Sequence, residues 1–141
     1  MVHNPDLFRA EILQAIPNLK LLILFGSRAK GTAREHSDWD LAILSADGSE
    51  LTSDPWGELG LYEKLGHILQ VSSDQIDLVN LNHCSPLLKY AVALQGKVLY
   101  EAEPNLFIDF QRQAWHIYLD TAKLRAYEQE YIRRGLENLK Q

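Results

Sequence analysis

The segment between Gly26 and Asp40 constrains this chain most, because it joins two apolar runs through a polar connection that carries a fixed set of acids. The first run, over 21–25, ends in Gly26-Ser27, and ten residues separate Ser27 from Asp38. Alternate side chains of a strand share one face, so we expect Asp38 and Asp40 about 7 Å apart at Cα. Two carboxylates this close repel each other unless a cation or a proton lies between them. The segment therefore predicts two strands joined at a metal site.

A third acid, Asp77, lies in the middle of another apolar run, over 75–81. An aspartate inside an apolar strand is costly unless it has a partner. If this strand is next to the one that carries Asp38 and Asp40, Asp77 completes a cluster of three carboxylates. Such oxygen ligands suit Mg²⁺ or Mn²⁺, and the cluster can hold two ions roughly 3.5–4 Å apart. The alternatives for Asp77 are a surface position on an edge strand and an N-cap outside any strand.

The turn at Gly26-Ser27 has the composition of a phosphate-binding loop. A glycine lets the backbone approach a phosphate, and backbone N–H groups and the Ser27 hydroxyl can donate hydrogen bonds to its oxygens. Arg28, Lys30 and Arg34 add positive charge, and we expect Arg28, next to the turn, to contact the phosphate. The alternatives are that Ser27 caps a helix after the turn and that the cations belong to a solvated loop. The turn and the acids together predict a site for a nucleoside triphosphate and two metal ions.

The pattern G-S-x₁₀-D-x-D, followed by a third aspartate on a later strand, resembles that of the DNA polymerase β-like nucleotidyltransferases. The residues that match it are Gly26, Ser27, Asp38, Asp40 and Asp77. Within that superfamily the short chain is similar to the minimal nucleotidyltransferases, the MntA-type antitoxins that are paired with HEPN-domain ribonuclease toxins. The resemblance covers residues 5–101.

The resemblance implies an antitoxin that transfers AMP from ATP to a tyrosine hydroxyl of a cognate HEPN toxin, releases pyrophosphate and neutralises the toxin. It implies that Asp38, Asp40 and Asp77 are catalytic and bind two Mg²⁺ ions. Gly26 and Ser27 would hold the β- and γ-phosphates of the ATP substrate. Two alternatives stay open: an antitoxin that acts by binding alone, and an adenylyltransferase for a small molecule such as an aminoglycoside.

Composition narrows the setting in which this chemistry is expected. The chain has 141 residues, a formal net charge of -5 and a sequence pI of about 5.5, which argues against direct nucleic-acid binding. A single cysteine, Cys84, excludes an internal disulfide framework and fits a reducing cytosol. The apolar runs are far shorter than a membrane span, and no secretory signal is visible. We therefore expect a cytoplasmic protein without membrane contact.

Apolar periodicity and chain breakers predict an α/β (α+β) fold of four strands and four helices. The strands are expected over 19–25, 39–44, 75–81 and 97–101, and the helices over 5–16, 55–69, 86–96 and 105–134. We expect a mixed sheet with helices largely on one face, the polymerase β-like nucleotidyltransferase fold, with the metals on the uncovered face. Trp39 should point away from the aspartates into the core.

The second helix should begin with Asp54 as N-cap and Pro55 at its first position. Five apolar residues are expected on its inner side: Leu59, Leu61, Leu65, Ile68 and Leu69.

The C-terminal part predicts a helix that extends past the core. We divide the chain into a nucleotidyltransferase core, 1–104, and a C-terminal helical extension, 105–141, in one domain. No glycine or proline interrupts 105–134, so one helix of ~45 Å is expected there. No acceptor-binding domain follows the core, so a projecting, apolar part would suit a protein partner. The whole helix carries large side chains at Phe107, Phe110, Trp115, Tyr118, Leu124, Tyr127 and Tyr131. The alternative is that most of them cover the sheet or the neighbouring helices.

Overall fold

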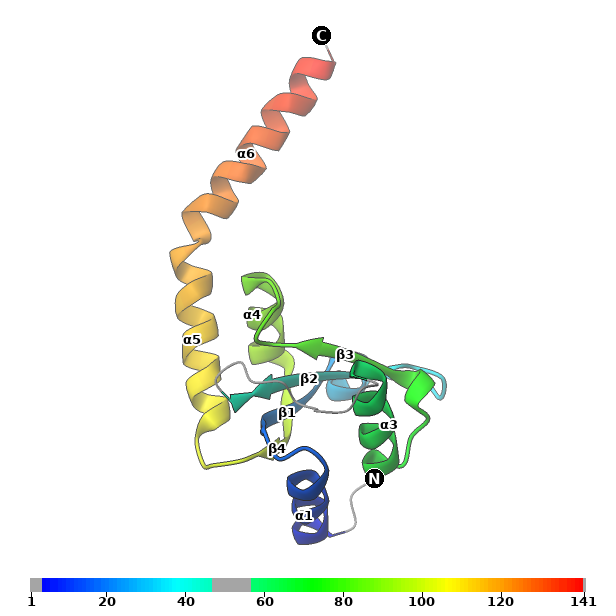
Figure 1. The fold of residues 1–141 in the computed structure, drawn as a ribbon. Helices are drawn as coiled ribbons and strands as arrows, with labels where there is room; N and C mark the ends of the chain where they lie inside the picture. Colours follow the sequence, from blue (N-terminus) through cyan, green and yellow to red (C-terminus); the bar gives the residue numbers. More distant parts are fainter. Residues whose placement is uncertain (1–3, 47–56, 141) are drawn as a thin grey trace.

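A computed structural model describes residues 4–46 and 57–140, which surround a four-stranded mixed sheet (Figure 1). The strands are β1 (Leu19–Phe25), β2 (Trp39–Ser45), β3 (Ile76–Asn80) and β4 (Lys97–Glu101), and their order is β3-β2-β1-β4. β1 pairs antiparallel with β2 and β4, while β2 pairs parallel with β3. A parallel pair needs a crossover, which a helix between β2 and β3 provides. The four strands expected from the sequence are confirmed.

Two helices begin where a polar side chain accepts hydrogen bonds from the first backbone N–H groups. In α1 (Pro5–Ala15), the side-chain oxygen of Asn4 accepts hydrogen bonds from the N–H groups of Asp6 and Leu7. In α4 (Pro86–Gln95), the Ser85 hydroxyl oxygen accepts from the N–H of Leu88, and proline occupies the first position. Both helices are confirmed.

Two short helical elements and the crossover helix complete the core. The short elements are α2 (Gly26–Lys30) and the 3₁₀ helix η2 (Ser73–Gln75), and the crossover helix is α3 (Glu58–Leu69). The expected cap of the crossover helix, Asp54 with Pro55, lies outside the described residues.

Helices cover both faces of the sheet, which corrects the expectation that they lie largely on one face. In the view of Figure 1, α1 and α3 lie below the sheet and α4 above it. The core is accordingly divided in two. One cluster joins α1 and α3 to side chains such as Leu22 and Leu41, and the other joins α4 and α5 (Leu106–Asp120) to side chains such as Ile23 and Ala42. The physical reason is that β1 is apolar at almost every position, so both of its faces need cover.

The cover is incomplete on the side of α4 and α5. α4 packs on β1, and α5 packs on β1 and β4. On that same side, the beginnings of β2 and β3 carry the half-exposed Asp40 and the exposed Asp77. This open part of the sheet is where the acids of the sequence pattern lie.

One side chain of α3 that was expected on the inner side, Leu59, lies on the outer side of the helix. Leu61, Leu65, Ile68 and Leu69 are buried, as expected, but Leu59 is exposed. Leu59 is only two positions from Leu61, and residues two apart on an α-helix point to different sides. The apolar character of Leu59 therefore does not show that it belongs to the core.

The C-terminal segment forms two helices rather than one. α5 ends at Asp120, and α6 (Ala122–Leu139) begins after Thr121. The Thr121 hydroxyl donates to the carbonyl of Ile117 at 2.9 Å, and Arg125 donates to the Thr121 hydroxyl oxygen and to the carbonyl of Tyr118. These side chains compete with the backbone for the carbonyls of the last turn of α5, which explains a break that the absence of glycine and proline did not reveal.

The junction between the two helices is anchored to the core by a stack of side chains. The ring of Tyr118 lies on that of Tyr90 in α4, with 3.8 Å between the ring centroids and 8° between the ring planes. The guanidinium of Arg125 lies over Tyr118, 3.7 Å from the ring centroid. α6 thus leaves the core in a direction that its first turn helps to set.

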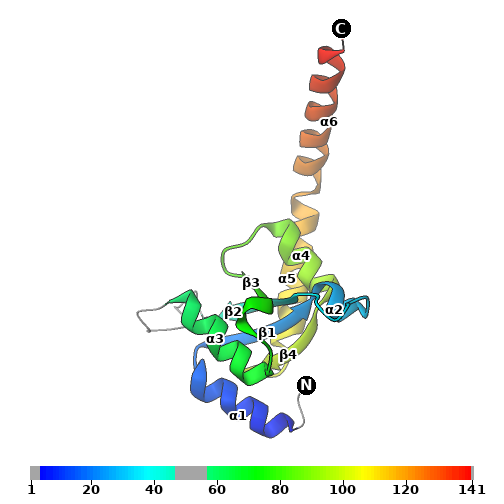
Figure 2. The same ribbon diagram turned by 90° about the vertical axis from the view of Figure 1, so that its right-hand side faces the viewer.

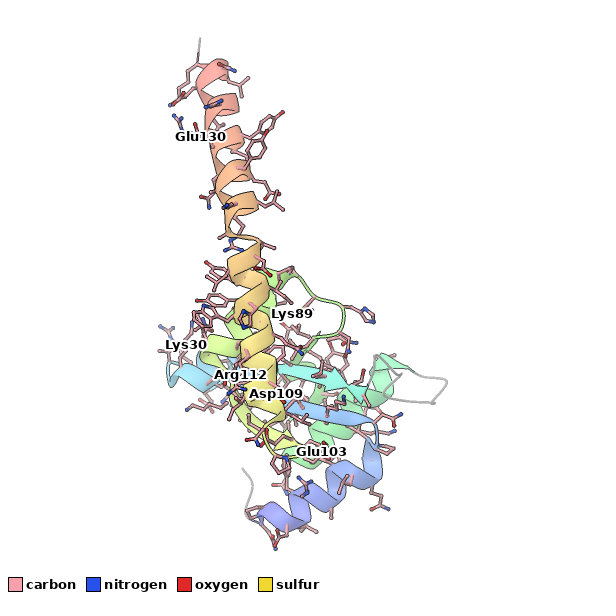
Figure 3. The ribbon with its side chains drawn as sticks, turned by 90° about the vertical axis from the view of Figure 1, so that its left-hand side faces the viewer. Lys30, Lys89, Glu103, Asp109, Arg112 and Glu130 are labelled. Carbon is pink, nitrogen blue, oxygen red and sulfur yellow. The ribbon has the colours of Figure 1, made fainter. Side chains whose placement is uncertain are left out.

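Beyond this junction α6 projects from the body of the molecule, as expected for the C-terminal extension (Figure 2). It has no buried residue. Glu130 lies on this projecting part, far from Asp109 and Arg112 on α5 (Figure 3). Across residues 4–46 and 57–140, no helix has the combination of length and apolar character that crossing a membrane requires.

The outer edge of the sheet is tied to α1 at one end of β4. Arg9 donates hydrogen bonds to the carbonyls of Glu101, at 2.8 Å, and Ala102, at 2.7 Å. Its guanidinium also lies 5.4 Å from the ring centroid of the buried Tyr100. The side chain thereby joins the first helix to the last strand.

Candidate active site

The strand register brings the three acids of the sequence pattern to one end of the sheet. Asp40, the second residue of β2, is the direct neighbour of Asp77 in the parallel strand β3. Asp38 lies immediately before β2. On its other side Asp40 faces Phe25, the last residue of β1. Asp77 is an exposed residue of the edge strand β3, as the first alternative describes, and at this edge it neighbours Asp40. The N-cap alternative is wrong, because Asp77 lies within the strand.

The electrostatics of Asp40 reflect this arrangement. Partial burial raises the pKa of the Asp40 carboxyl above its ordinary value of 3.8, and the negative charges of Asp77 and Asp38 raise this pKa further. Asp38 and Asp77 are therefore each close enough to repel the Asp40 carboxylate. A bound cation would relieve this repulsion.

The glycine of the turn packs directly on the central acid. Gly26 has a φ of +71°, a left-handed conformation that favours glycine, and a Cβ added to it would overlap a carboxylate oxygen of Asp40. No side chain can be accommodated there without moving the acid. The glycine thus brings the turn backbone against the carboxylate cluster, as a site that joins phosphates to metal ions requires.

Ser27 is the second residue of α2, with Phe25 at the N-cap. The alternative that Ser27 caps a following helix is therefore wrong. Ser27 directly follows Gly26, the residue that packs on Asp40. α2 ends at Gly31, which has a φ of +78° and whose N–H bonds back to the Ser27 carbonyl.

Arg28 has a different environment from the one expected for a phosphate ligand. Its guanidinium donates hydrogen bonds to the carbonyl of Ser37, from Nη2 at 2.8 Å and from Nε at 3.2 Å. It also lies 4.1 Å from the centroid of the Trp39 ring, which packs against the core as expected. A contact between Arg28 and a phosphate stays a prediction. Sequence reasoning missed that Arg28 binds the loop before β2. The only signal for it was an aromatic residue next to Asp38.

The carboxylates fit a metal site in their chemistry and position, although they are not gathered around one point. Among the described residues, no three histidine, cysteine or acidic side chains form a group that could hold a metal ion as they stand. Asp38 and Asp77 are exposed, so their side chains can rotate toward Asp40 at little cost. Carboxylate oxygens are the donors that Mg²⁺ prefers, and these three lie at one end of the sheet beside a glycine turn.

A glycine-serine turn packed on paired strand acids, in a mixed sheet with flanking helices, defines a nucleotidyltransferase. The family model "Polymerase beta, Nucleotidyltransferase" matches residues 10–105. The protein adenylyltransferase MntA of Aphanizomenon flos-aquae (strain 2012/KM1/D3) is 38% identical over 133 residues, which are 92% of this chain and 86% of that protein. The chain belongs to the polymerase β family of nucleotidyltransferases and, within it, to the MntA-type protein adenylyltransferases.

Solved structures agree with this assignment over most of the chain. A chain of a toxin–antitoxin crystal structure with AMP-PNP is 30% identical and superimposes with a TM-score of 0.68, covering 92% of this chain and 98% of that one. A chain from the complex of the tri-AMPylated Shewanella oneidensis HEPN toxin with the MNT antitoxin is 28% identical, with a TM-score of 0.58, covering 92% of this chain and 99% of that one. The expected fold class is confirmed.

Proposed function

We propose that this protein is an antitoxin that transfers AMP from ATP to a cognate HEPN toxin and thereby neutralises it. The observation that carries the proposal is the similarity, over almost the whole chain, to protein adenylyltransferases and to a chain crystallised with an AMPylated HEPN toxin. The intact set of turn and acids supports an active enzyme over an antitoxin that acts by binding alone.

The residues of the site have distinct roles in this proposal. Asp38 and Asp40 would bind both divalent ions, and Asp77 would bind the ion nearest the acceptor. Gly26 and Ser27 would hold the β- and γ-phosphates through backbone N–H groups and the Ser27 hydroxyl. When bound, the ions neutralise phosphate charge and lower the pKa of the acceptor hydroxyl.

The reaction balances without a side-chain nucleophile. The acceptor oxygen, which the family resemblance assigns to a tyrosine, forms a bond to the α-phosphorus of ATP. The bond from that phosphorus to the bridging oxygen breaks, and pyrophosphate leaves. The proton of the acceptor hydroxyl passes to Asp77, which is exposed on the open part of the sheet.

The toxin would dock on the apolar face of α6. Six side chains recur at helical spacing and form what we call the α6 apolar face: Leu124, Tyr127, Tyr131, Ile132, Leu136 and Leu139. Tyr127 and Tyr131 are 71% and 72% exposed, so they have almost no cover within the chain. An exposed apolar face of this length on a projecting helix is typical of a protein interface.

The other side of α6 is occupied by its own charges. Arg133 bridges Glu130 and Glu137, and Arg134 also pairs with Glu130. These exposed pairs contribute little to stability, but they leave the polar side satisfied. The apolar face is therefore the side of α6 that gains most from a partner.

The experiment is intact-mass analysis of the toxin encoded with this protein after incubation with ATP and Mg²⁺. We expect mass gains in whole units of AMP that are absent with the Asp38→Asn/Asp40→Asn variant and absent when the acceptor tyrosine is phenylalanine. A second pair of variants tests the docking surface. Tyr127→Ser/Tyr131→Ser should reduce the rate of modification, while Lys123→Ser, outside the apolar face on the same helix, should not.

Two results would contradict the proposal. Toxin neutralised without any mass gain would favour an antitoxin that acts by binding alone. An unmodified toxin together with efficient adenylylation of an aminoglycoside would favour the small-molecule enzyme.

A further inference from the structure

The loop between α2 and β2, residues 31–38, determines where Asp38 lies, because Asp38 ends this loop and precedes the strand. Within the loop, the Ser37 hydroxyl oxygen accepts a hydrogen bond from the N–H of Arg34 at 2.8 Å, and the Ser37 N–H donates to the Arg34 carbonyl at 3.0 Å. These bonds shape the turn but connect it to nothing else. The loop needs another contact to hold Asp38 at a fixed place near Asp40.

Arg28 supplies that contact on both sides of Asp38. Its guanidinium donates two hydrogen bonds to the carbonyl of Ser37, the residue before Asp38. The same guanidinium lies over the ring of Trp39, the residue after Asp38, at 4.1 Å. A third, longer hydrogen bond of 3.5 Å reaches the carbonyl of Glu35.

The Trp39 ring that Arg28 contacts is itself held in place by the core. Trp39 packs against the core cluster formed with α1 and α3, so the ring under the guanidinium cannot move freely. At its other end Arg28 belongs to α2, one residue beyond Ser27 in the phosphate turn. The side chain therefore joins the turn that would hold the phosphates to the loop that ends in an acid.

We propose that Arg28 is a positioning residue, which sets the distance between the Gly26-Ser27 turn and the Asp38 carboxylate through Ser37 and Trp39. The inference rests on the proposed function, because it assumes that Asp38 acts on the ATP-bound ions. Positive charge near the phosphates is not its main contribution. Lys30 and Arg34 are exposed cations of the same segment and could supply charge equally well.

The Arg28→Lys variant separates the contribution of positioning from the contribution of positive charge. A lysine keeps the charge but cannot donate from a planar fork to one carbonyl or stack flat on an indole. The test compares wild type with Arg28→Lys and with Arg112→Lys, which makes the same change at an exposed position on α5. All three are first checked for equal secondary structure and for melting temperatures well above the assay temperature.

The first readout does not depend on activity. Trypsin cleaves after Lys30 and Arg34, which flank or lie within the loop, and cleavage of a folded protein tracks local opening. We expect Arg28→Lys to be cleaved at these sites at least about fivefold faster than wild type or Arg112→Lys, because the loop opens more often. Equal cleavage of all three proteins would overturn the proposal.

The second readout separates the effect of the substitution on kcat from its effects on the KM for ATP and on the Mg²⁺ requirement. With Asp38 displaced, we expect kcat to fall about 10- to 100-fold at saturating Mg²⁺, a range in keeping with the cost of a small misplacement. The KM for ATP should change little, while the half-saturating Mg²⁺ concentration should rise. An increased KM for ATP with unchanged kcat would instead identify Arg28 as a phosphate ligand. Unchanged kinetics in a destabilised protein would identify a purely structural residue.

A second variant keeps the proposal testable if Arg28→Lys does not fold. Trp39→Leu removes the stacking surface but retains an apolar side chain toward the core, and it should shift cleavage and kcat in the same directions, by less. If the wild-type protein modifies no partner, the proposed function fails, yet the trypsin comparison still decides whether Arg28 holds the loop.

Discussion

At the scale of single residues, the site depends on a close approach between a glycine and an acid that are fourteen positions apart in the chain. Gly26 directly follows the last residue of β1 and packs on Asp40 of β2, and the positive φ and the missing side chain are both needed there. The acid in turn carries a raised pKa because of burial and of its two acidic neighbours. The two residues can be tested separately.

Replacing Gly26 by alanine should remove transfer and destabilise the protein. A left-handed alanine costs roughly 1–2 kcal/mol, and the new methyl group would also overlap Asp40. Gly31→Ala is the matched control, because Gly31 has a similar φ of +78° but open space around a Cβ. We expect both variants to lose stability in urea denaturation and only Gly26→Ala to lose transfer. Full transfer by Gly26→Ala would show that the turn does not need its close approach to Asp40.

Replacing Asp40 by asparagine should abolish transfer yet raise the melting temperature of the metal-free protein at neutral pH. A raised pKa means that the stability supplied by protonated Asp40 is present at low pH and is lost as pH rises through that pKa. The neutral asparagine does not suffer this loss. The gain should shrink as pH falls toward 3.8, where the wild-type carboxyl is increasingly protonated. A variant less stable than wild type at neutral pH in a chelating buffer contradicts this account.

At the scale of elements, the strands and the acids were predictable because their signals are local. A short apolar run such as Leu19–Phe25, bounded by Pro17-Asn18 and Gly26, favours a strand, and the spacing of Asp38, Asp40 and Asp77 indicates one end of the sheet. Side-chain contacts across elements were not predictable. Apart from the aromatic Trp39, nothing in the sequence around Arg28 distinguishes a phosphate ligand from a side chain that binds a loop carbonyl. The break at Thr121 likewise arises from side-chain hydrogen bonds that ordinary helix-forming residues conceal.

The turn that begins α2 should distinguish nucleotides by their distal phosphates. Ligands that bind only the folded state raise the melting temperature. We expect a clear increase with Mg²⁺ and a non-hydrolysable ATP analogue, and a much smaller one with Mg²⁺ and AMP, because Gly26 and Ser27 are assigned to the β- and γ-phosphates. The Asp38→Asn/Asp40→Asn variant should lose most of the difference. Equal increases in melting temperature with both nucleotides would show that the turn does not bind the β- and γ-phosphates.

At the scale of the whole molecule, the protein consists of a compact catalytic body and a projecting helix that contributes nothing to the core. The connection between them is the stack of Tyr90, Tyr118 and Arg125. A toxin that docks on α6 would therefore be held at a set direction from the acids, and proximity rather than a dedicated pocket would bring its acceptor to the site.

Ending the chain after Asp120 should separate catalysis on ATP from recognition of the toxin. Residues 121–140, the described part of the removed segment, are all exposed or half-exposed, so we expect the shortened protein to fold and to keep its stabilisation by Mg²⁺ and the ATP analogue. Toxin binding in gel filtration and AMP transfer in intact-mass analysis should both fall sharply. Arg125→Ala in the full chain should give an intermediate result, because α6 remains but its direction is less fixed. Undiminished modification of the toxin by the shortened protein would place the docking surface on the catalytic body.

The side chain of Arg9 has a consequence for how this molecule meets other proteins. β4 is an edge strand, and an open edge offers its backbone to any extended chain that can pair with it. At the end of β4 the carbonyls of Glu101 and Ala102 are already bound by the guanidinium. A foreign strand would have to displace a charged, bidentate donor before it could extend the sheet there. The fold thus discourages pairing with a foreign strand at this end of β4.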